Sequence, residues 1–300
     1  MNFKRNFWWV VIFLCASSCI KDIDIAYPDY EEQIVLTGLM QPDSILKVRV
    51  AKTLPVLSAD NNYPVISNAS VVCFENNVKI GNLLYTKDGF YVLNYRPKAG
   101  LSYRFEVLYE DKRIVAEDTI PNVTDIMIKL GSINSQNPNQ NPDLFLSLSR
   151  RQASYVWLSA ITSYKYGTKL ETSGAIIASS HPLFDTFNTR KSLEGINGYE
   201  KYARLKPDFL GNINFKFTVA NQVSVVKAKG DSFFFQISDV SQNYDRYLKS
   251  SLTAFKSSPS KNGGINDPFS EPIAIYSNVK NGIGIVGAIQ TRRIILKEGK

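Results

Sequence analysis

The sequence contains very little histidine and cysteine, the residues on which many enzyme and metal sites depend. Its 300 residues include one histidine, His181, and three cysteines. Histidine is the usual general base near neutral pH, and zinc sites need clustered histidine or cysteine ligands. The proline in SSHPLFD places His181 in a loop, where we expect a surface or capping role. The composition therefore excludes the usual zinc arrangements and argues against a histidine-dependent active site.

Several motifs that indicate a particular chemistry are also missing. The sequence has no G-x-x-x-x-G-K-S/T phosphate loop, no dinucleotide-binding glycine fingerprint and no G-x-S-x-G elbow. Asp267 and Glu271 in DPFSE are candidates for calcium, but they lack EF-hand spacing, so we predict a turn there. Carboxylate pairs for sugar hydrolysis are defined by distance in space, and no pair stands out. We expect no catalytic residues, no metal site and no cofactor.

The charge pattern argues against nucleic-acid binding. The formal net charge is +8, from 35 Lys and Arg against 27 Asp and Glu, and basic residues are scattered among acidic ones without a run of five. A nucleic-acid interface needs basic residues clustered on one face or a recognised motif. We therefore interpret the mild basicity as an ordinary solvated surface.

The opening letters, MNFKRNFWWVVIFLCASSC, have the three parts of a secretory signal peptide. Lys4 and Arg5 supply positive charge, FWWVVIFL is an apolar run, and small residues follow it. A membrane-spanning helix needs about 20 apolar residues, and this run is far shorter. We predict that residues 1–18 are a signal peptide.

The end of this segment predicts lipidation of Cys19. The letters ASSC resemble the lipobox of bacterial lipoproteins, in which the cysteine thiol receives a diacylglycerol and the chain is cut before it. Cys15 is the competing candidate, but the preceding Leu14 is too large for that cut. The alternative is ordinary cleavage that leaves Cys19 as a free thiol. We expect residues 19–30 to form a lipidated tether, with Cys73 as a small buried strand residue.

Residues 31–122 have the pattern of short strands separated by turns. The clearest strand alternates apolar and more polar residues through LSYRFEVLYE, which is the period-two pattern of a half-buried strand. KDG and PKAG supply turn residues. Seven such segments within this range predict an immunoglobulin-like β-sandwich.

Residues 123–300 continue with strand-like runs, among them LFLSLS, YVWLSAITSYKYG, INFKFTVA and SFFFQIS. They predict a mainly β protein with a second β domain, either a sandwich or a partly closed barrel. Tyr164 and Tyr166 in TSYKYG are the best candidates for ligand contact in a loop, with ordinary strand packing as the alternative.

One amphipathic helix is predicted at residues 241–258, with Ser241 as its N-cap. Its apolar face consists of Tyr244, Tyr247, Leu248, Leu252 and Phe255. Farther along, Gly284 and Gly287 in IGIVGAIQTRRIIL predict a close backbone approach or a bulge.

These segments follow a recognisable order. An early IVLTGLM strand follows the lipobox, ARLKPDFLGNINFKF lies mid-chain, and SQNYDRYLKS precedes DPFSEPIAIYSNVKNGIGIVGA. Together they resemble the Bacteroidota lipoprotein family of domain of unknown function 4249 (DUF4249), over nearly the whole mature chain. Asn281 stands where a second glycine is expected. The resemblance implies an outer-membrane lipoprotein, often encoded beside a TonB-dependent transporter, and it carries over no catalytic residues.

Two short motifs suggest export and modification. Lys21 and Asp22, just after Cys19, resemble the surface-export signal of Bacteroidota lipoproteins, although Ile23 interrupts the acidic run. The alternative is a solvated tether. Ser44 in DSI and Thr119 in DTI are candidate O-glycosylation sites of the kind found in these bacteria, with a turn residue and a strand-edge threonine as the alternatives.

Our leading hypothesis is a lipid-anchored outer-membrane protein that faces the cell exterior. It would act as a non-catalytic binding or accessory module for a TonB-dependent transporter in nutrient uptake, with a glycan or peptide as ligand and no nucleic-acid partner. A second hypothesis is an envelope structural or adhesion protein that binds a surface polymer. A glycan hydrolase is the third.

Overall fold

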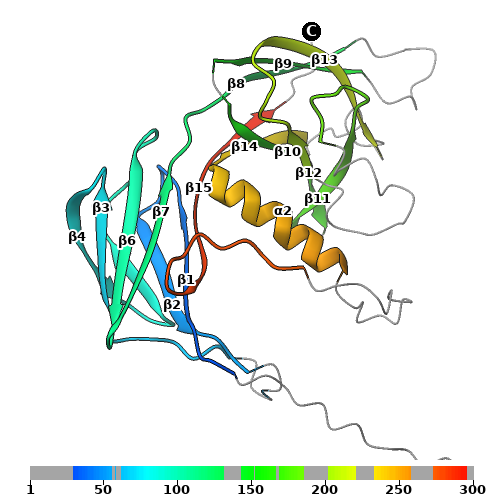
Figure 1. Cartoon of the computed structure of the whole chain (residues 1–300). Coiled ribbons are helices and arrows are strands. Elements are labelled where there is room, and N and C mark those ends of the chain that lie inside the picture. Colours follow the sequence, from blue (N-terminus) through cyan, green and yellow to red (C-terminus); the bar gives the residue numbers. More distant parts are fainter. Residues whose placement is uncertain are drawn as a thin grey trace, which may run out of the picture. The chain divides into compact units, whose positions relative to one another are not determined.

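The computed structural model describes a chain that is mainly β (Figure 1). It covers residues 30–55, 58, 62–131, 143–151, 153–166, 169–185, 202–220, 233–257 and 273–295. The chain separates into Met1–Glu31 and Glu32–Lys300, and every element below belongs to the second unit. The mainly β prediction is confirmed, and the strands are not closed into a barrel.

The first seven strands are β1 (Ile34–Met40), β2 (Leu46–Lys52), β3 (Ser70–Glu75), β4 (Val78–Tyr85), β5 (Phe90–Leu93), β6 (Ser102–Tyr109) and β7 (Lys112–Thr119). The later strands are β8 (Asp125–Leu130), β9 (Leu144–Arg150), β10 (Tyr155–Tyr166), β11 (Lys169–Ala178), β12 (Tyr202–Leu205), β13 (Gly211–Ala220), β14 (Phe233–Val240) and β15 (Ile283–Ile295). Hydrogen bonds connect them in the order β7-β6-β3-β4-β5-β2-β1-β15-β14-β10-β11-β13-β9-β8, with β12 paired to β10.

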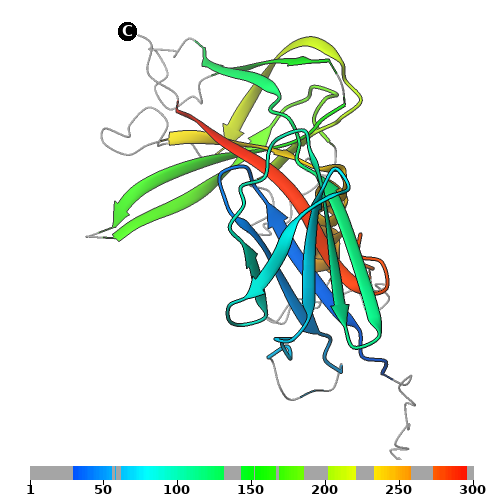
Figure 2. The ribbon, with the colours of Figure 1, turned by 90° about the vertical axis from the view of Figure 1, so that its left-hand side faces the viewer.

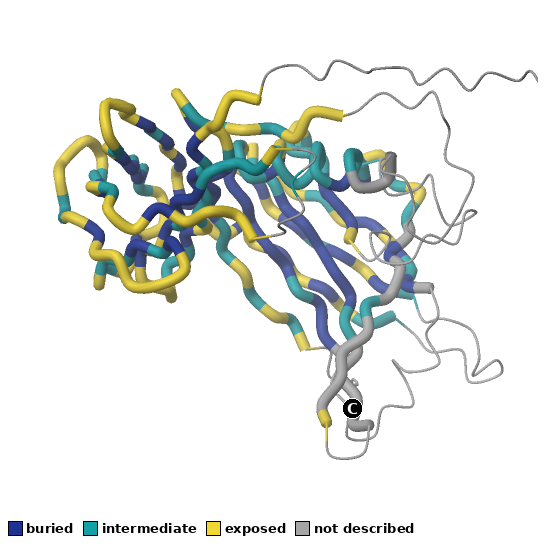
Figure 3. The backbone as a smooth tube through the Cα atoms, turned by 90° about the horizontal axis from the view of Figure 1, so that it is seen from below, coloured by how far each residue is buried: buried dark blue, intermediate teal, exposed yellow. Residues whose placement is uncertain are grey.

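The first seven strands and part of β15 form a β-sandwich. Strand β6 alternates as predicted, with Tyr103, Phe105 and Val107 buried and their neighbours more exposed. The interior also takes Leu36 from β1 and Val286 from β15. Figure 3 shows such buried positions in dark blue along the strands. Buried positions also alternate with more exposed ones in β1, β2 and β7, so the apolar faces of these strands meet and exclude water from one core.

The later strands enclose a second core. Strands β8, β9 and β13 contribute Ile128, Leu146 and Phe217, while β10 and β14 contribute Leu158 and Phe235. All five side chains are buried. The row of hydrogen-bonded strands therefore curls, so that β8, β9 and β13 cover one face of β10 and β14.

Strand β15 belongs to both halves. It pairs in parallel with β1 and antiparallel with β14, and Figure 2 shows it in red beside the blue β1. The predicted domain ranges 31–122 and 123–300 are thus connected through one ladder, and the boundary at residue 122 stays a prediction. Because consecutive positions of a strand face opposite sides, β15 can pack against two different layers.

Two glycines allow β15 to approach its neighbours closely, as expected. A Cβ on Gly284 would collide with the backbone of Leu36, and its φ is +122°. A Cβ on Gly287 would lie 2.5 Å from the ring of Tyr244. Asn281 has a φ of 59°, in the left-handed region that asparagine tolerates better than most residues. This explains how asparagine replaces the expected glycine.

The helix α2 spans Gln242–Ser257, in agreement with the predicted 241–258. The Ser241 hydroxyl accepts a hydrogen bond from the Tyr244 N–H over 3.1 Å, which confirms Ser241 as the N-cap. One face of α2 packs on the sheet through Tyr244, Leu248 and Leu252, against a cluster that includes Trp157. The side chain of Phe255 lies outside the description. Within the described residues, no helix is long and apolar enough to cross a membrane.

The segment 273–280, which we call the strap, leads into β15 and is tied to α2 and β7. The Tyr276 N–H donates to Ser250 Oγ over 2.8 Å, and the Tyr276 hydroxyl donates to Asn243 Oδ1 over 2.7 Å. Asn278 donates from Nδ2 to the carbonyl oxygens of Glu117 and Val286 and accepts from the Val286 N–H. Tyr276 and Asn278 therefore tie the strap to α2, β7 and β15.

Candidate binding pocket along helix α2

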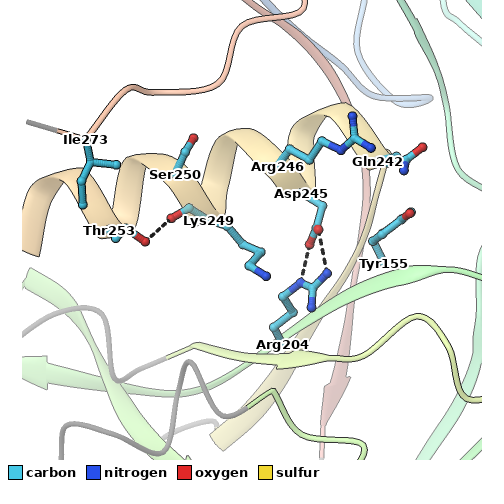
Figure 4. Close-up of a pocket in the computed structure, with 9 residues that line it drawn as sticks. All are labelled: Tyr155, Arg204, Gln242, Asp245, Arg246, Lys249, Ser250, Thr253 and Ile273. Atoms are coloured by element: carbon cyan, nitrogen blue, oxygen red, sulfur yellow. Dashed lines mark hydrogen bonds and ion pairs between the residues drawn. The ribbon is translucent and has the colours of Figure 1, made fainter.

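A pocket of about 460 Å³ lies along α2 (Figure 4). Its lining residues come from α2, β10, β12 and the first residue of the strap. They are Tyr155, Arg204, Gln242, Asp245, Arg246, Lys249, Ser250, Thr253 and Ile273. The volume falls in the range of about 300–1,000 Å³ that is typical of small-molecule sites.

Helical spacing places the polar lining on one side of α2. The six helix residues follow one another at intervals of three and one, from Gln242 to Thr253. Residues three, four and seven apart lie on the same face of a helix. The apolar residues Tyr244, Leu248 and Leu252 fall on another face and pack against the sheet. One helix thus supplies both the contact with the core and the wall of the pocket.

The floor of the pocket is a buried ion pair between Arg204 and Asp245. Nε of Arg204 lies 2.7 Å from Oδ1 of Asp245, and Nη2 lies 2.8 Å from Oδ2. The indole N–H of Trp157 also donates to Oδ1, over 2.9 Å. Arg204 is 6% exposed and Asp245 is 2% exposed. This two-bond geometry is the strong form of an arginine–carboxylate contact and fixes the orientation of both side chains.

Asp185 adds a second carboxylate to this network and connects Arg204 to Lys249 of α2. Nη1 of Arg204 lies 2.6 Å from Oδ2 of Asp185, and Lys249 Nζ lies 3.6 Å from the same oxygen. Burial by itself would lower the pKa of Arg204, but the hydrogen bonds and charges of Asp245 and Asp185 outweigh it and raise the pKa. Arg204 is therefore held in its charged form.

Two aromatic side chains lie beside these charges. Burial, followed by the negative charge of Asp245, raises the pKa of Tyr155, which keeps its phenol neutral. The guanidinium carbon of Arg246 lies 5.7 Å from the centre of the Tyr276 ring. This distance allows a cation–π interaction, so the exposed Arg246 is steadied by the strap.

Two other buried carboxylates join elements outside the pocket. Oδ1 of Asp118 accepts from the N–H of Thr119 over 2.9 Å, and Oδ2 accepts from the Ser241 hydroxyl. Asp239 accepts from the N–H of Thr124 over 3.0 Å and from Nη1 of Arg292 over 2.6 Å. Burial raises the pKa of Asp118 to about 6. Both carboxylates are satisfied by structural donors.

The predicted anchor, export and modification residues are placed as follows. Cys19, Lys21 and Asp22 lie outside the described residues. Ser44 is exposed in the turn between β1 and β2, and Thr119 is exposed at the end of β7. Both positions are accessible, and their glycosylation stays a prediction.

The predicted ligand tyrosines lie in β10 rather than in a loop. Tyr164 pairs with Glu171 and Tyr166 pairs with Lys169 of β11, and the side chains of both tyrosines lie outside the description. Their contact with a ligand stays a prediction. The alternative expected from the sequence, ordinary packing of the two side chains, also stays a prediction.

His181 is held by a backbone hydrogen bond and a ring contact, and Cys73 is buried in a strand. His181 Nδ1 accepts a hydrogen bond from the Leu183 N–H over 3.1 Å, and its ring stacks on Phe215 at 4.6 Å. This is the capping role expected for His181. Cys73 is fully buried in β3, as predicted, and burial raises the pKa of its thiol to about 12.

No local pattern in the sequence indicates the pocket. Arg204 and Asp245 stand in two of the motifs quoted above, ARLKPDFLGNINFKF and SQNYDRYLKS, but nothing in either motif shows that they meet. Among the described residues, no group of three or more His, Cys, Asp or Glu side chains could hold a metal ion. Asp267 and Glu271 lie outside those residues. The chemistry that the pocket offers is recognition by charge and hydrogen bonding.

Comparison with known proteins identifies one family. A family model described as domain of unknown function (DUF4249) matches residues 20–295. No match is found among curated proteins.

Two solved structures match this chain, both with low TM-scores. One is a DUF4785 family protein from Legionella pneumophila, at 11% identity and a TM-score of 0.26, with 67% of this chain and 49% of the other covered. The second is described as a membrane-anchored protein from Corynebacterium diphtheriae, at 13% identity and a TM-score of 0.19, with coverages of 72% and 55%. The chain spans about half the length of these structures.

Proposed function

The chain belongs to the DUF4249 family, and on that premise we propose that it is a lipid-anchored outer-membrane protein with a binding function. In this proposal Cys19 carries the lipid, and Lys21 and Asp22 direct the protein to the cell exterior. The β body acts as a non-catalytic binding or accessory module for a TonB-dependent transporter in nutrient uptake. The ligand is held in the pocket along α2.

One observation carries the non-catalytic part of the proposal: the buried carboxylate of the pocket is fully engaged. Both oxygens of Asp245 bond to Arg204, and Oδ1 also accepts from Trp157. A general acid or base must reach the reacting group of the substrate. A carboxylate that is 2% exposed and locked by two partners is better suited to shaping a site.

Membrane fractionation tests the anchor. We expect Cys19→Ala to release the protein from the membrane fraction, because two or more acyl chains are needed for durable attachment. Cys15→Ala is the matched control and should stay membrane-bound.

Protease treatment of intact cells tests the location. Survival of the protein while a known surface marker is cut would contradict surface exposure.

Affinity purification from native membranes tests the partner. With mild detergent, the lipidated protein should recover a TonB-dependent transporter that is absent from a purification of the Cys19→Ala variant. Recovery of the protein alone, under conditions that keep other outer-membrane complexes intact, would contradict the accessory role.

A further inference from the structure

The pocket along α2 carries an excess of positive charge. Among the described residues that line it or contact its lining ions, Arg204, Arg246 and Lys249 are cationic, and Asp185 and Asp245 are carboxylates. One positive charge is left in excess. A ligand with a single negative charge would neutralise it, whereas a neutral or cationic ligand would leave it uncompensated.

The geometry indicates which side chains would meet this charge. Both carboxylates are occupied by Arg204 below the surface of the pocket. Lys249 is 40% exposed and lies at the longer distance of 3.6 Å from Asp185, and Arg246 is exposed beside the Tyr276 ring. The planar guanidinium of Arg246 can donate two parallel hydrogen bonds to a carboxylate. Lys249 is directed toward Asp185, so Arg246 is the lining cation left to bind an anionic group.

The hydroxyl groups of the pocket indicate what else the ligand carries. Ser250 donates to the Tyr247 carbonyl and accepts from the Tyr276 N–H, and Thr253 donates to the Lys249 carbonyl. Each hydroxyl has one donor and two acceptor lone pairs. Both donors are therefore in use, while each oxygen keeps acceptor capacity. These oxygens can therefore accept from a ligand that donates hydrogen bonds, as hydroxyl groups do.

From these observations we propose that the pocket binds a sugar acid with one carboxylate, such as a hexuronate. The carboxylate accepts from Arg246, and ligand hydroxyls donate to Ser250 and Thr253. This inference rests on the proposed binding function and specifies its ligand class.

Calorimetric titration of the lipidated full chain in detergent tests the inference, with D-glucuronate and D-glucose as probes at low ionic strength. We expect glucuronate to bind at least about tenfold more tightly than glucose, which differs by the missing carboxylate. Arg246→Gln should weaken glucuronate binding by about tenfold or more and leave glucose binding unchanged. Arg96→Gln, an exposed arginine of the sandwich, is the matched control and should bind glucuronate like the unaltered chain.

Any of these results would overturn the inference: equal affinity for the two sugars, no binding of glucuronate, or tighter binding of N-acetyl-alanyl-alanine, which carries a carboxylate without hydroxyl groups. Unchanged glucuronate binding in Arg246→Gln would move the site elsewhere and also contradict it. Membrane fractionation and transporter recovery are independent of these titrations. Failure of the ligand class can therefore be distinguished from failure of the proposed function.

Discussion

Ser241 and Asp118 meet where helix α2 begins, because the Ser241 hydroxyl donates a hydrogen bond to Oδ2 of Asp118 on β7. The hydroxyl oxygen of Ser241 also accepts from the N–H groups of Tyr244 and Ala288, over 3.1 and 3.3 Å. One small side chain therefore joins the helix to β7 and β15. The pocket depends on this junction, since it sets where α2 starts.

Removal of the Ser241 hydroxyl should weaken the fold. We expect Ser241→Ala to lower the free energy of unfolding by about 2 kcal/mol, because α2 loses its N-cap and Asp118 loses a buried partner. Urea unfolding followed by circular dichroism measures the change. Ser44→Ala, in an exposed turn, should change it by less than about 0.5 kcal/mol. Equal effects of the two substitutions would contradict the role of Ser241.

Asp118 should make stability depend on pH. Burial raises its pKa from 3.8 to about 6. Because the folded-state pKa lies above the unfolded value, the stabilising contribution is complete below about pH 4 and is lost as the pH rises through about 6. We expect the free energy of unfolding to fall by about 2 kcal/mol between pH 4 and pH 7 relative to Asp118→Asn. Parallel pH profiles of the two proteins would show that Asp118 is not the titrating group.

Breaking the ion pair at the pocket floor should be costly. We expect Arg204→Met to lower the free energy of unfolding by about 3–5 kcal/mol, because it leaves the buried Asp245 without its cation. Arg113→Met is the control, since Arg113 is 63% exposed in its pair with Glu106 and should contribute less than about 1 kcal/mol. Guanidinium unfolding compares the two. If both variants lost a similar small amount of unfolding free energy, the buried Arg204–Asp245 pair would contribute no more to stability than an exposed pair.

The contact between Gly287 and Tyr244 should be visible in a double-mutant cycle. Gly287→Ala introduces a Cβ into the space of the Tyr244 ring and should cost about 1–3 kcal/mol. In a Tyr244→Ala background the same change should cost less, because the ring carbons at 2.5 and 2.8 Å are gone and only the Cβ contact of 2.9 Å remains. Thermal unfolding of the four proteins measures the coupling. Additive effects would mean that the helix shifts to accept the methyl group.

Asn278 should hold the strap in place. It makes three hydrogen bonds with the backbones of Glu117 and Val286, so Asn278→Ala should cost about 2–3 kcal/mol. It should also speed amide hydrogen exchange at Val286 and Tyr276. Asn82→Ala, at an exposed position of β4, is the control and should leave exchange there unchanged. Unaltered exchange in Asn278→Ala would show that other contacts hold the strap.

The features that sequence predicted correctly are local ones. The alternation of Tyr103, Phe105 and Val107 predicts a half-buried strand because side chains alternate across a sheet. Ser241 predicts the helix start because a cap bonds to residues two or three positions away. Each of these signals is complete within a few residues. The predictions for Cys19, Lys21 and Asp22 are of the same local kind, and they await the cell experiments.

The pocket could not be predicted because its parts are distant in the sequence. Arg204 and Asp245 are 41 positions apart, and Trp157 and Asp245 are 88 apart. Nothing in a local pattern states which strand will lie beneath which helix. The parallel pairing of β1 with β15 has the same origin, since it joins the two ends of the described chain.

By itself, the sequence determined that this is a mainly β chain with one capped helix, because alternation, turn residues and capping act between near neighbours. Only the tertiary structure decided that Arg204 is an ion-pair partner rather than a surface charge, and that Arg246 and Lys249 line a pocket. Those roles depend on burial and on partners from other elements. A charged side chain acquires them only when the long-range strand pairing brings β10, β12 and α2 together.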